Sequence, residues 1–315
     1  MGDPDVAVLR HGVHGRPIGE YVDCLRERLP DRTVARARTP AEERELVSSA
    51  PVVTGLQMDE DLLEAATSLD LFACLYAGVG HLPLSAFEER GVAVTNAAGV
   101  HGPKIAEYVV GALLTFTQGF HQGWQRGQRR EWRHYQTREL QDSTVAVVGL
   151  GAIGTTVVDR LEPFGVETVG VRYTPEKGGP TDDVVGFDDI HEACTGADYL
   201  ILACPLTDQT EGLVDGSVFE TLPPDAVLVN VARGPVVDTD ALVRALRKNH
   251  IRGAVLDVTD PEPLPEDHPL WTFSNVVVTP HNAGDTPQYY ERVADILAEN
   301  LQRLETGEEL RNRAV

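Results

Sequence analysis

The chain has 315 residues, a length that favours two domains, and no apolar run approaches the roughly 20 residues that a membrane-spanning helix needs. Its formal net charge is −22 and only three of its 27 basic residues are lysines, an acidic balance that argues against nucleic acid and anionic membranes as partners. Because such a surface repels itself unless salt screens it, we expect a protein from a halophile rather than an ordinary acidic protein. We also expect a cytoplasmic protein, because the sequence does not open with the charged and then apolar residues of a secretion signal.

Residues 1–99 have the pattern of one α/β unit. Strand-like apolar stretches lie at residues 5–10, 51–55, 69–76 and 92–96, and helical patterns fill the gaps between them. Strands separated by helix-length segments are typical of a parallel sheet covered by helices. The sequence therefore predicts a small α/β unit at the N-terminus.

A long helical pattern begins at Pro103 and continues through Phe116. We expect this helix to cross between the two domains. The stretch after it is basic and aromatic and contains Trp124, Arg129, Arg130, Trp132 and Arg133. A nucleic-acid patch is one interpretation, but in so acidic a chain a packed arm or a subunit contact is favoured.

A second α/β series begins at Ser143. Its predicted strands are 144–148, 168–172, 199–203, 226–230, 253–258 and 276–279, and six strands make a full dinucleotide-binding sheet. An amphipathic helix follows at residues 289–304, with no sheet of its own to cover. We therefore expect this last helix to pack back on the N-terminal unit.

The four cysteines are scattered through apolar stretches without a C-x-x-C pair, at Cys24, Cys74, Cys194 and Cys204. This spacing argues against a zinc site and against a disulfide framework. We expect buried free thiols and no metal site.

The segment GLGAIG at residues 149–154 has the spacing G-x-G-x-x-G and follows the apolar run TVAVVG. Gly149 would make the turn, Gly151 would let the backbone approach a pyrophosphate, and Gly154 would let the next helix sit close to the strand. The N-terminus of that helix would then face the phosphates. The glycine spacing is weak evidence alone, but a strand before it and a helix after it predict a dinucleotide site.

Arg172 stands at the end of the next predicted strand, where NAD-binding proteins place an acid for the ribose 2′-hydroxyl. A guanidinium can instead hold a 2′-phosphate through charge-assisted hydrogen bonds, with help from Tyr173, Thr174 and Lys177. The sequence therefore predicts NADP(H) as the preferred carrier, with NAD(H) as the alternative. A solvated arginine, or one that stacks on the adenine, is the other interpretation of this residue.

Three polar residues follow strands of the second unit, namely Arg233, Glu262 and His281. Ligands bind at the carboxyl ends of strands in sheets of this kind. Reduction of a ketone needs an acid for the nascent alkoxide, a role that suits His281, while Glu262 would raise its proton affinity and orient its ring. Arg233 can pair with the carboxylate of a 2-keto acid and polarise its carbonyl. Each residue alone also fits a structural role, but together they predict a 2-keto acid reductase.

A series of motifs lies along nearly the whole chain: YAGVGHLPL at 76–84, KIAEYVVGALL at 104–114, TVAVVGLGAIG at 144–154, CPLTDQT at 204–210, VNVARGPVVD at 229–238, DVTDPEPLP at 257–265, HPLW at 268–271 and TPHNAG at 279–284. Together they resemble the D-isomer-specific 2-hydroxyacid dehydrogenase family, which includes the glyoxylate/hydroxypyruvate reductases. The resemblance implies an α/β fold of two Rossmann-like domains with doubly wound parallel sheets. A flavodoxin-like substrate-binding domain would be discontinuous, at 1–99 and 285–315, and a dinucleotide-binding domain would occupy 100–284.

The resemblance also implies a catalytic set of Arg233, Glu262 and His281, with the histidine as acid and base. The backbone amides of Ala77 and Gly78 would bind the substrate carboxylate. The same matching implies a homodimer formed largely through the cofactor domain. It carries over cofactor contacts at Ala152, Ile153, Cys204, Pro205, Thr210, Val231, Ala232, Asp257, His281 and Gly284.

Two positions depart from the family pattern in the substrate loop. Gly80 replaces a common aspartate, and Tyr76 stands where a small residue is frequent. We expect Leu56, Tyr76 and Trp271 around the substituent of the substrate, although packing alone also accounts for these three. Both departures would change the choice of substrate.

Other functions fit the same motifs. The resembled family also contains C-terminal-binding-protein corepressors, so a cofactor-sensing binding protein is one alternative. It is disfavoured because we expect such a protein to carry partner-binding tails. A formate dehydrogenase is disfavoured because that relative has an amide in place of Glu262, whereas a phosphoglycerate dehydrogenase remains an alternative.

Overall fold

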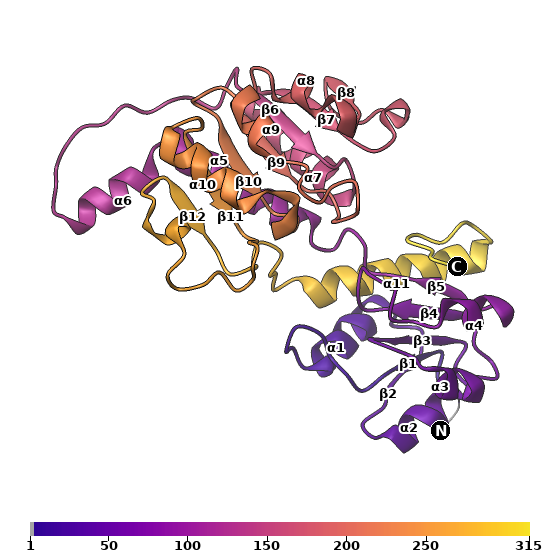
Figure 1. Cartoon of the computed structure of the whole chain (residues 1–315). Helices are drawn as coiled ribbons and strands as arrows, with labels where there is room; N and C mark the ends of the chain where they lie inside the picture. Colours follow the sequence, from indigo (N-terminus) through magenta and orange to yellow (C-terminus); the bar gives the residue numbers. More distant parts are fainter. Residues whose placement is uncertain (1–2) are drawn as a thin grey trace. The chain divides into compact units, whose positions relative to one another are not determined.

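The computed structural model describes residues 3–315, and these form two compact units (Figure 1). Unit 1 combines the chain up to Val100 with Thr286–Val315, and unit 2 is His101–Asp285. Each border lies one residue beyond the predicted position.

Unit 1 is built on a five-stranded parallel sheet with the order β2-β1-β3-β4-β5. This is the flavodoxin-like strand order. The strands are β1 (Val6–Val8), β2 (Val34–Arg36), β3 (Val52–Gly55), β4 (Leu71–Cys74) and β5 (Ala93–Thr95). Only β2 was not predicted. It is a three-residue edge strand in which Val34 alone is buried, so it lacks the apolar run of the central strands.

Four short helices complete the N-terminal part of unit 1: α1 (Ile18–Arg28), α2 (Pro40–Val47), α3 (Glu60–Ala65) and α4 (Leu84–Glu89). The sequence encodes two of their starts, because Thr39 accepts a hydrogen bond from the amide of Glu42 and Asp59 accepts one from Leu62. Tyr21 and Leu25 of α1 belong to one buried cluster. A second cluster contains Phe72 and Phe87, so the sheet is covered on both faces.

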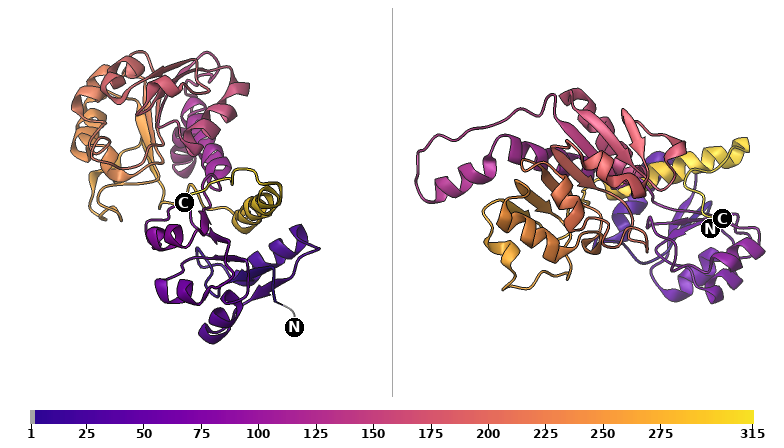
Figure 2. Two further views of the ribbon diagram at one scale, coloured as in Figure 1. Left: turned by 90° about the vertical axis from the view of Figure 1, so that its right-hand side faces the viewer. Right: turned by 45° about the horizontal axis from the view of Figure 1, so that its top comes forward.

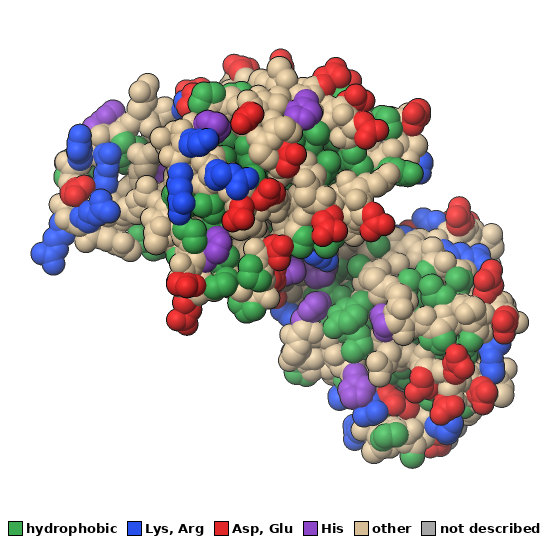
Figure 3. Space-filling view, in the orientation of Figure 1, with side chains coloured by type: hydrophobic (Ala, Val, Ile, Leu, Met, Phe, Trp, Pro, Cys, Tyr) green, Lys and Arg blue, Asp and Glu red, His purple; other side chains and the backbone are tan. Residues whose placement is uncertain are grey.

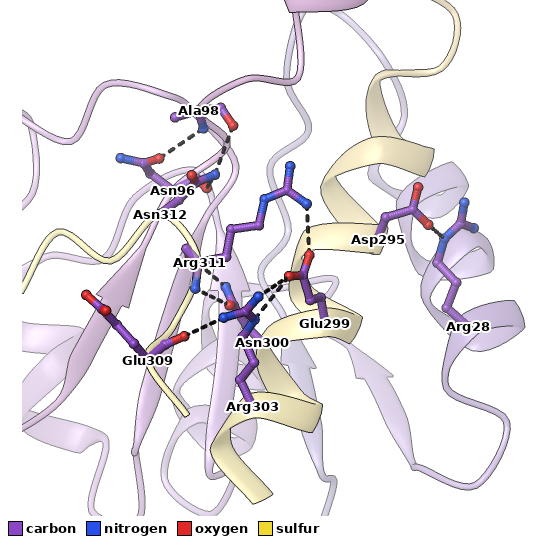
Figure 4. Close-up of polar contacts among 10 residues, drawn as sticks. All are labelled: Arg28, Asn96, Ala98, Asp295, Glu299, Asn300, Arg303, Glu309, Arg311 and Asn312. Atoms are coloured by element: carbon purple, nitrogen blue, oxygen red, sulfur yellow. Dashed lines mark hydrogen bonds and ion pairs between the residues drawn. The ribbon is translucent and has the colours of Figure 1, made fainter. Parts of the chain in front are cut away.

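The chain returns to unit 1 through α11 (Tyr289–Thr306), which packs along α1. Figure 4 shows how polar side chains fix this return. Asn300 exchanges two hydrogen bonds with the backbone of Arg311, and Asn312 donates to the carbonyl oxygens of Asn96 and Ala98. The predicted terminal helix is therefore part of unit 1.

Unit 2 contains a seven-stranded parallel sheet with the order β12-β11-β10-β9-β6-β7-β8. Its strands are β6 (Thr144–Val148), β7 (Glu167–Val171), β8 (Asp183–Val185), β9 (Tyr199–Leu202), β10 (Val227–Asn230), β11 (Gly253–Leu256) and β12 (Val276–Val278). The predicted fold class, two α/β domains with parallel sheets, is confirmed. The expected number of six strands was wrong, because β8 adds a short edge strand with no fully buried residue.

Helices cover both faces of this sheet, as the turned views of Figure 2 show. One buried cluster joins α5 and α7, and another joins α9 and α10. The helix after Pro103 lies wholly inside unit 2, so the expectation that it crosses between domains was wrong. The α-helices are α5 (Gly102–Thr117), α6 (Phe120–Gln128), α7 (Ala152–Leu161), α8 (Ile190–Cys194), α9 (Gly216–Thr221) and α10 (Thr239–Lys248), and the short 3-10 helices are η1 (Glu162–Phe164), η2 (Pro175–Lys177), η3 (Phe187–Asp189), η4 (Gly234–Val236) and η5 (Pro269–Thr272).

All four cysteines are free thiols in the described chain. Cys74, Cys194 and Cys204 are buried as expected, whereas Cys24 is only half-buried because it lies on α1 near the solvent. Burial raises the pKa of Cys194 to about 12 and that of Cys204 to about 11. Among residues 3–315, no helix combines the length and the apolar character that crossing a membrane requires.

Candidate active site

His281 and Glu262 form a hydrogen bond at the carboxyl edge of the unit 2 sheet, and this contact is an ion pair when the imidazole is protonated. His281 follows β12 by three residues, Glu262 lies in the loop after β11, and the two strands are neighbours. Nδ1 of the histidine is 2.6 Å from Oε1 of the glutamate. A carboxylate only accepts hydrogen bonds, so Nδ1 carries the proton and Nε2 is left for other chemistry. Both side chains are nearly half exposed, at 49% and 42%.

The buried carboxylate of Asp257 organises the backbone around His281. The amide of His281 donates to the carbonyl oxygen of Asp257 (2.8 Å), while the amides of Asn282 and Ala283 donate to its two carboxylate oxygens (3.0 and 2.9 Å). Thr279 donates its hydroxyl to the same carboxylate at 2.7 Å. Asp257 was predicted as a cofactor contact, but its carboxylate accepts hydrogen bonds from the segment 279–283 and so fixes the backbone on both sides of His281.

A cavity of about 390 Å³ opens beside the ion pair. Trp271, predicted to lie near the substrate, lines it together with Leu264, His281 and Glu262. The indole of Trp271 is half exposed, and its Nε1 donates to the carbonyl oxygen of Pro265 at 2.9 Å. That bond fixes the ring, so the tryptophan presents a rigid apolar wall next to the acid–base pair.

Arg233 follows β10, the strand beside β11, at the same edge of the sheet. Gly234 lets this turn approach the loop after β11 closely, because a Cβ at this position would lie 1.9 Å from the carbonyl oxygen of Thr259. The exposed guanidinium donates to the carbonyl oxygen of Ala232 at 2.6 Å. Within the described residues it makes no hydrogen bond to Glu262 or His281.

The glycine loop between β6 and α7 has the backbone that its sequence predicts. Gly149 has a φ of +100°, and a Cβ there would lie 2.6 Å from the backbone of Cys204. A Cβ at Gly154 would lie 1.9 Å from the carbonyl oxygen of Gly149, so only glycine lets α7 pack this closely. Around Gly151, the N-cap of α7, the space is open. The amides at the start of α7 are therefore accessible to an anion.

A cavity of about 640 Å³ lies against this loop. Eight of the predicted cofactor contacts line it: Gly149, Gly151, Arg172, Tyr173, Thr174, Cys204, Pro205 and Thr210. The lining also contains Lys177 and five residues that we did not predict, Leu150, Phe187, Thr207, Asp208 and Gln209. The remaining predicted contacts are not part of this lining, namely Ala152, Ile153, Gly154, Val231, Ala232, Asp257, His281 and Gly284.

Two polar residues of the cavity wall have defined partners. Arg172 lies just beyond β7 and donates from one guanidinium nitrogen to the carbonyl oxygen of Gly178 at 2.5 Å. Thr210 is buried, donates to the carbonyl oxygen of Pro205 at 2.6 Å and accepts from the amide of Thr207 at 2.8 Å. Thr210 thus shapes the loop that closes one side of the cavity, while Arg172 keeps most of its donors available.

The predicted substrate contacts of unit 1 follow its neighbouring strands β3 and β4. Leu56 comes directly after β3, and Tyr76, Ala77 and Gly78 follow β4. Ala77 and Gly78 are exposed, and a Cβ at Gly78 would meet no atom within 4 Å. Their backbone is therefore accessible, as binding of a carboxylate through amides requires.

Sequence reasoning missed two histidines beside Tyr76. The ring centroids of His14 and His81 lie 5.6 and 6.2 Å from that of Tyr76. Nε2 of His81 is also 2.8 Å from the carbonyl oxygen of Leu56, which links the two substrate segments. His81 lies in the same motif as Tyr76, so its position in the sequence was a usable signal, whereas His14 comes from a distant loop.

Residues 110–283 match the family model of the NAD binding domain of D-isomer specific 2-hydroxyacid dehydrogenases. A glyoxylate reductase from Thermofilum pendens is 34% identical over 80% of this chain and 76% of its own length. A D-3-phosphoglycerate dehydrogenase from Methanocaldococcus jannaschii is 32% identical over 93% of this chain, which spans 57% of that relative. A solved D-isomer specific 2-hydroxyacid dehydrogenase from Xanthobacter autotrophicus, in complex with NADPH and MES, is 26% identical with a TM-score of 0.76, covering 99% of this chain and 98% of its own. The chain is therefore an enzyme of the D-isomer-specific 2-hydroxyacid dehydrogenase family.

Proposed function

We propose that this family member transfers a hydride between NADP(H) and a small 2-keto acid or D-2-hydroxy acid. The observation that supports this most is the 2.6 Å ion pair of His281 and Glu262 on the sheet that also carries the glycine loop. An imidazole oriented by a carboxylate is suited to give and take a proton near neutral pH. In this proposal unit 2 binds the dinucleotide and unit 1 contributes the substrate loop.

The residues around the glycine loop fit a dinucleotide. The cavity of about 640 Å³ is within the usual size of a cofactor site. Open space at Gly151 leaves the first amides of α7 free to bind a pyrophosphate. A bound nicotinamide dinucleotide would supply the hydride, and the protein supplies binding, orientation and the proton.

The cavity favours a 2′-phosphate over a 2′-hydroxyl. Arg172 takes the position after β7 where an NAD-specific acid is expected, and Lys177 lines the same cavity. The bond to Gly178 uses one of the five guanidinium donors, so the others can bind a phosphate. Tyr173 and Thr174 complete this end of the cavity. The related enzyme from Xanthobacter autotrophicus is in complex with NADPH, which agrees with this preference.

Each member of the catalytic set has one task. His281 donates a proton from Nε2 to the oxygen that forms as the ketone is reduced, and Glu262 stabilises the imidazolium. Arg233 binds the substrate carboxylate and polarises its carbonyl, and the open amides of Ala77 and Gly78 bind the same carboxylate. In the oxidative direction His281 takes the proton back.

The segment from Phe120 to Tyr135 in unit 2, which we call the arm, supports the proposal of a homodimer. Tyr135 folds back onto α6, where Gly119 and Gly123 leave room for its ring. The guanidinium of Arg126 lies 5.1 Å from the centre of that ring and donates to the carbonyl oxygens of Arg133 and His134, which precede Tyr135 in the chain. These contacts hold Tyr135 against α6, although no residue of α6 is itself buried.

The arm presents aromatic side chains to the solvent. Phe120 and Trp124 are mostly exposed, and Trp132 is fully exposed. Figure 3 shows Lys and Arg side chains gathered in the region of α6 in unit 2, whereas acidic side chains are spread over both units. A second copy, with its net charge of −22, offers an acidic surface for these arginines. Burial of these aromatic side chains between the two copies would then stabilise the dimer.

Steady-state assays with glyoxylate, hydroxypyruvate and pyruvate, each with NADPH and NADH, test the proposed function. We expect turnover with NADPH that is lost in His281→Ala, while NADPH binding is kept. The relative from Methanocaldococcus jannaschii favours 3-phosphoglycerate dehydrogenase as a second candidate, so oxidation of 3-phosphoglycerate belongs in the same panel. Binding of NADPH without turnover of any of these acids would contradict both enzymes and favour a cofactor-sensing protein.

A further inference from the structure

Tyr108 has no part in the proposed chemistry, yet its hydroxyl reaches the segment that carries His281. It lies in the second turn of α5, and its hydroxyl oxygen is 2.6 Å from Oγ1 of Thr279. Thr279 is the first residue after β12 and precedes His281 by two positions. The contact joins residues that are 171 positions apart in the chain.

The hydrogen bonds around Thr279 have one possible direction. Its Oγ1 is 2.7 Å from a carboxylate oxygen of Asp257, and a carboxylate only accepts. Thr279 therefore gives its proton to Asp257, and Tyr108 must donate to Thr279. Burial raises the pKa of Tyr108 to about 12, so the phenol keeps the proton that this bond needs at neutral pH.

Asp257, at the end of this hydrogen-bonded chain, holds the backbone that presents the imidazole. Its carboxylate accepts from the amides of Asn282 and Ala283, and its carbonyl oxygen accepts from His281. His281 has a φ of +52°, a left-handed conformation that is unfavourable for a residue with a Cβ. Such a backbone persists only where its surroundings fix it, and these bonds do so.

A second contact joins the N-terminus of α5 to the segment 279–284. Nδ1 of His101, the residue just before α5, is 2.9 Å from the carbonyl oxygen of Gly284. The start of α5 therefore contacts the segment 279–284 at both of its ends. His281 lies between the two contacts.

We propose that Tyr108 is a positioning residue for His281, which acts through Thr279 and Asp257 to fix the direction of the imidazole. The proposal rests on the proposed function for its effect on turnover, but its effect on the backbone is independent of any substrate. Loss of the phenol hydroxyl frees Thr279 from α5 and loosens the turn at 281–283. An imidazole that is less well aligned transfers its proton more slowly.

Tyr108→Phe removes only the hydroxyl, and the chain offers a matched control in Tyr199→Phe. The hydroxyl of Tyr199 is 2.7 Å from Oγ1 of Thr117, on the same helix α5, and Thr117 donates to the carbonyl oxygen of Leu113. Tyr199 is the first residue of β9, at the amino edge of the sheet and thus opposite the edge that carries His281. The two variants remove the same kind of bond at different distances from the proposed acid.

Two measurements test the proposal: hydrogen exchange of the amides at 281–283 in the free protein, and kcat with glyoxylate and NADPH. For Tyr108→Phe we expect faster exchange and a kcat about threefold to tenfold lower, with the KM for NADPH changed by less than about twofold. Tyr199→Phe should change none of these. Wild-type exchange and wild-type kcat in Tyr108→Phe, or equal changes in both variants, would overturn the proposal.

A second pair of variants, at Thr279, tests whether the effect of Tyr108→Phe comes from the lost hydrogen bond. Thr279→Ser keeps the hydroxyl between Tyr108 and Asp257 and should retain slow exchange, whereas Thr279→Val should lose it. Equal exchange in the serine and valine variants would also overturn the proposal. If His281→Ala were as active as the parent, the acid–base role would fail, while the exchange data would still decide whether Tyr108 fixes the turn.

Discussion

The imidazole of His281 and the carboxylate of Glu262 face each other across 2.6 Å, although 19 positions separate them in the chain. Neighbouring parallel strands bring them together, because β11 and β12 end at the same edge of the sheet. A carboxylate only accepts hydrogen bonds, so this contact fixes the tautomer with the proton on Nδ1. Nε2 is therefore the ring nitrogen that is left for the proposed proton transfer.

We expect Glu262→Gln to lower kcat by about 10-fold to 100-fold, because the amide still accepts from Nδ1 but no longer stabilises the imidazolium. The KM for NADPH should stay the same, since Glu262 does not line the dinucleotide cavity. Glu266→Gln, which removes an exposed charge from the same loop, is the control. Equal kcat values in the two variants, measured by steady-state kinetics, would remove Glu262 from the mechanism.

We expect Arg172→Asp to raise the KM for NADPH roughly tenfold or more and to leave or lower that for NADH. The physical reason is that an aspartate repels a 2′-phosphate but accepts from a 2′-hydroxyl. Arg247→Asp makes the same charge change on the exposed last turn of α10 and should not alter the preference. An unchanged ratio of NADPH to NADH efficiency in Arg172→Asp would show that this residue does not select the cofactor.

We expect Trp132→Ala to shift the protein from dimer to monomer, because no side chain among residues 3–315 covers the fully exposed indole of Trp132. The molar mass from light scattering after gel filtration measures the change. Leu304→Ala, which truncates an exposed apolar residue of α11 in unit 1, should leave the mass unchanged. A wild-type protein that is monomeric at the concentrations tested would contradict the dimer itself.

The central strands of both sheets could be predicted because each is a continuous apolar run that parallel sheets bury on both faces. The edge strands β2 and β8 could not, because each has only three residues and is partly exposed.

The candidate site could be predicted where a motif carries its own local geometry. The glycine loop is such a case, because the left-handed φ of Gly149 and the close contact of Gly154 need glycine at those positions. The contacts of Tyr108 with Thr279 and of His14 with Tyr76 join distant segments and have no signal in a single sequence. Only the packed structure brings such side chains together.

We expect the contribution of Glu299 to stability to disappear in acid. Hydrogen bonds from Arg311 and Arg303 lower the pKa of this carboxyl from its usual 4.5. A carboxyl with a lowered pKa in the folded state stabilises the protein above the unfolded value of about 4.5 and loses this effect as the pH falls through the folded value. Glu299→Gln should therefore be less stable than the parent at pH 7, with a smaller difference below pH 4.5.

Urea unfolding at the two pH values measures this difference in the free energy of unfolding. The contacts lie on α11 and the C-terminal segment, as Figure 4 shows, so no part of the proposed active site is changed. Glu308→Gln, on the same segment, controls for the loss of one acidic side chain. A difference that stays constant from pH 7 to below pH 4.5 would mean that the ion pairs of Glu299 do not stabilise the fold.

We expect the thermal stability of the protein to rise with salt. A formal net charge of −22 on 315 residues makes the folded state repel itself, and Figure 3 shows acidic side chains spread over both units. The screening length falls from about 10 Å at 0.1 M salt to about 3 Å at 1 M, so neighbouring carboxylates stop repelling each other. The Tm should therefore increase by several degrees between about 0.1 M and 1 M KCl at constant pH.

Sucrose is the control for this prediction, because it stabilises proteins by exclusion from their surface and does not screen charges. A Tm that rises with sucrose but not with KCl would argue against adaptation to a salt-rich cell, because the repulsion would then be too weak to need screening.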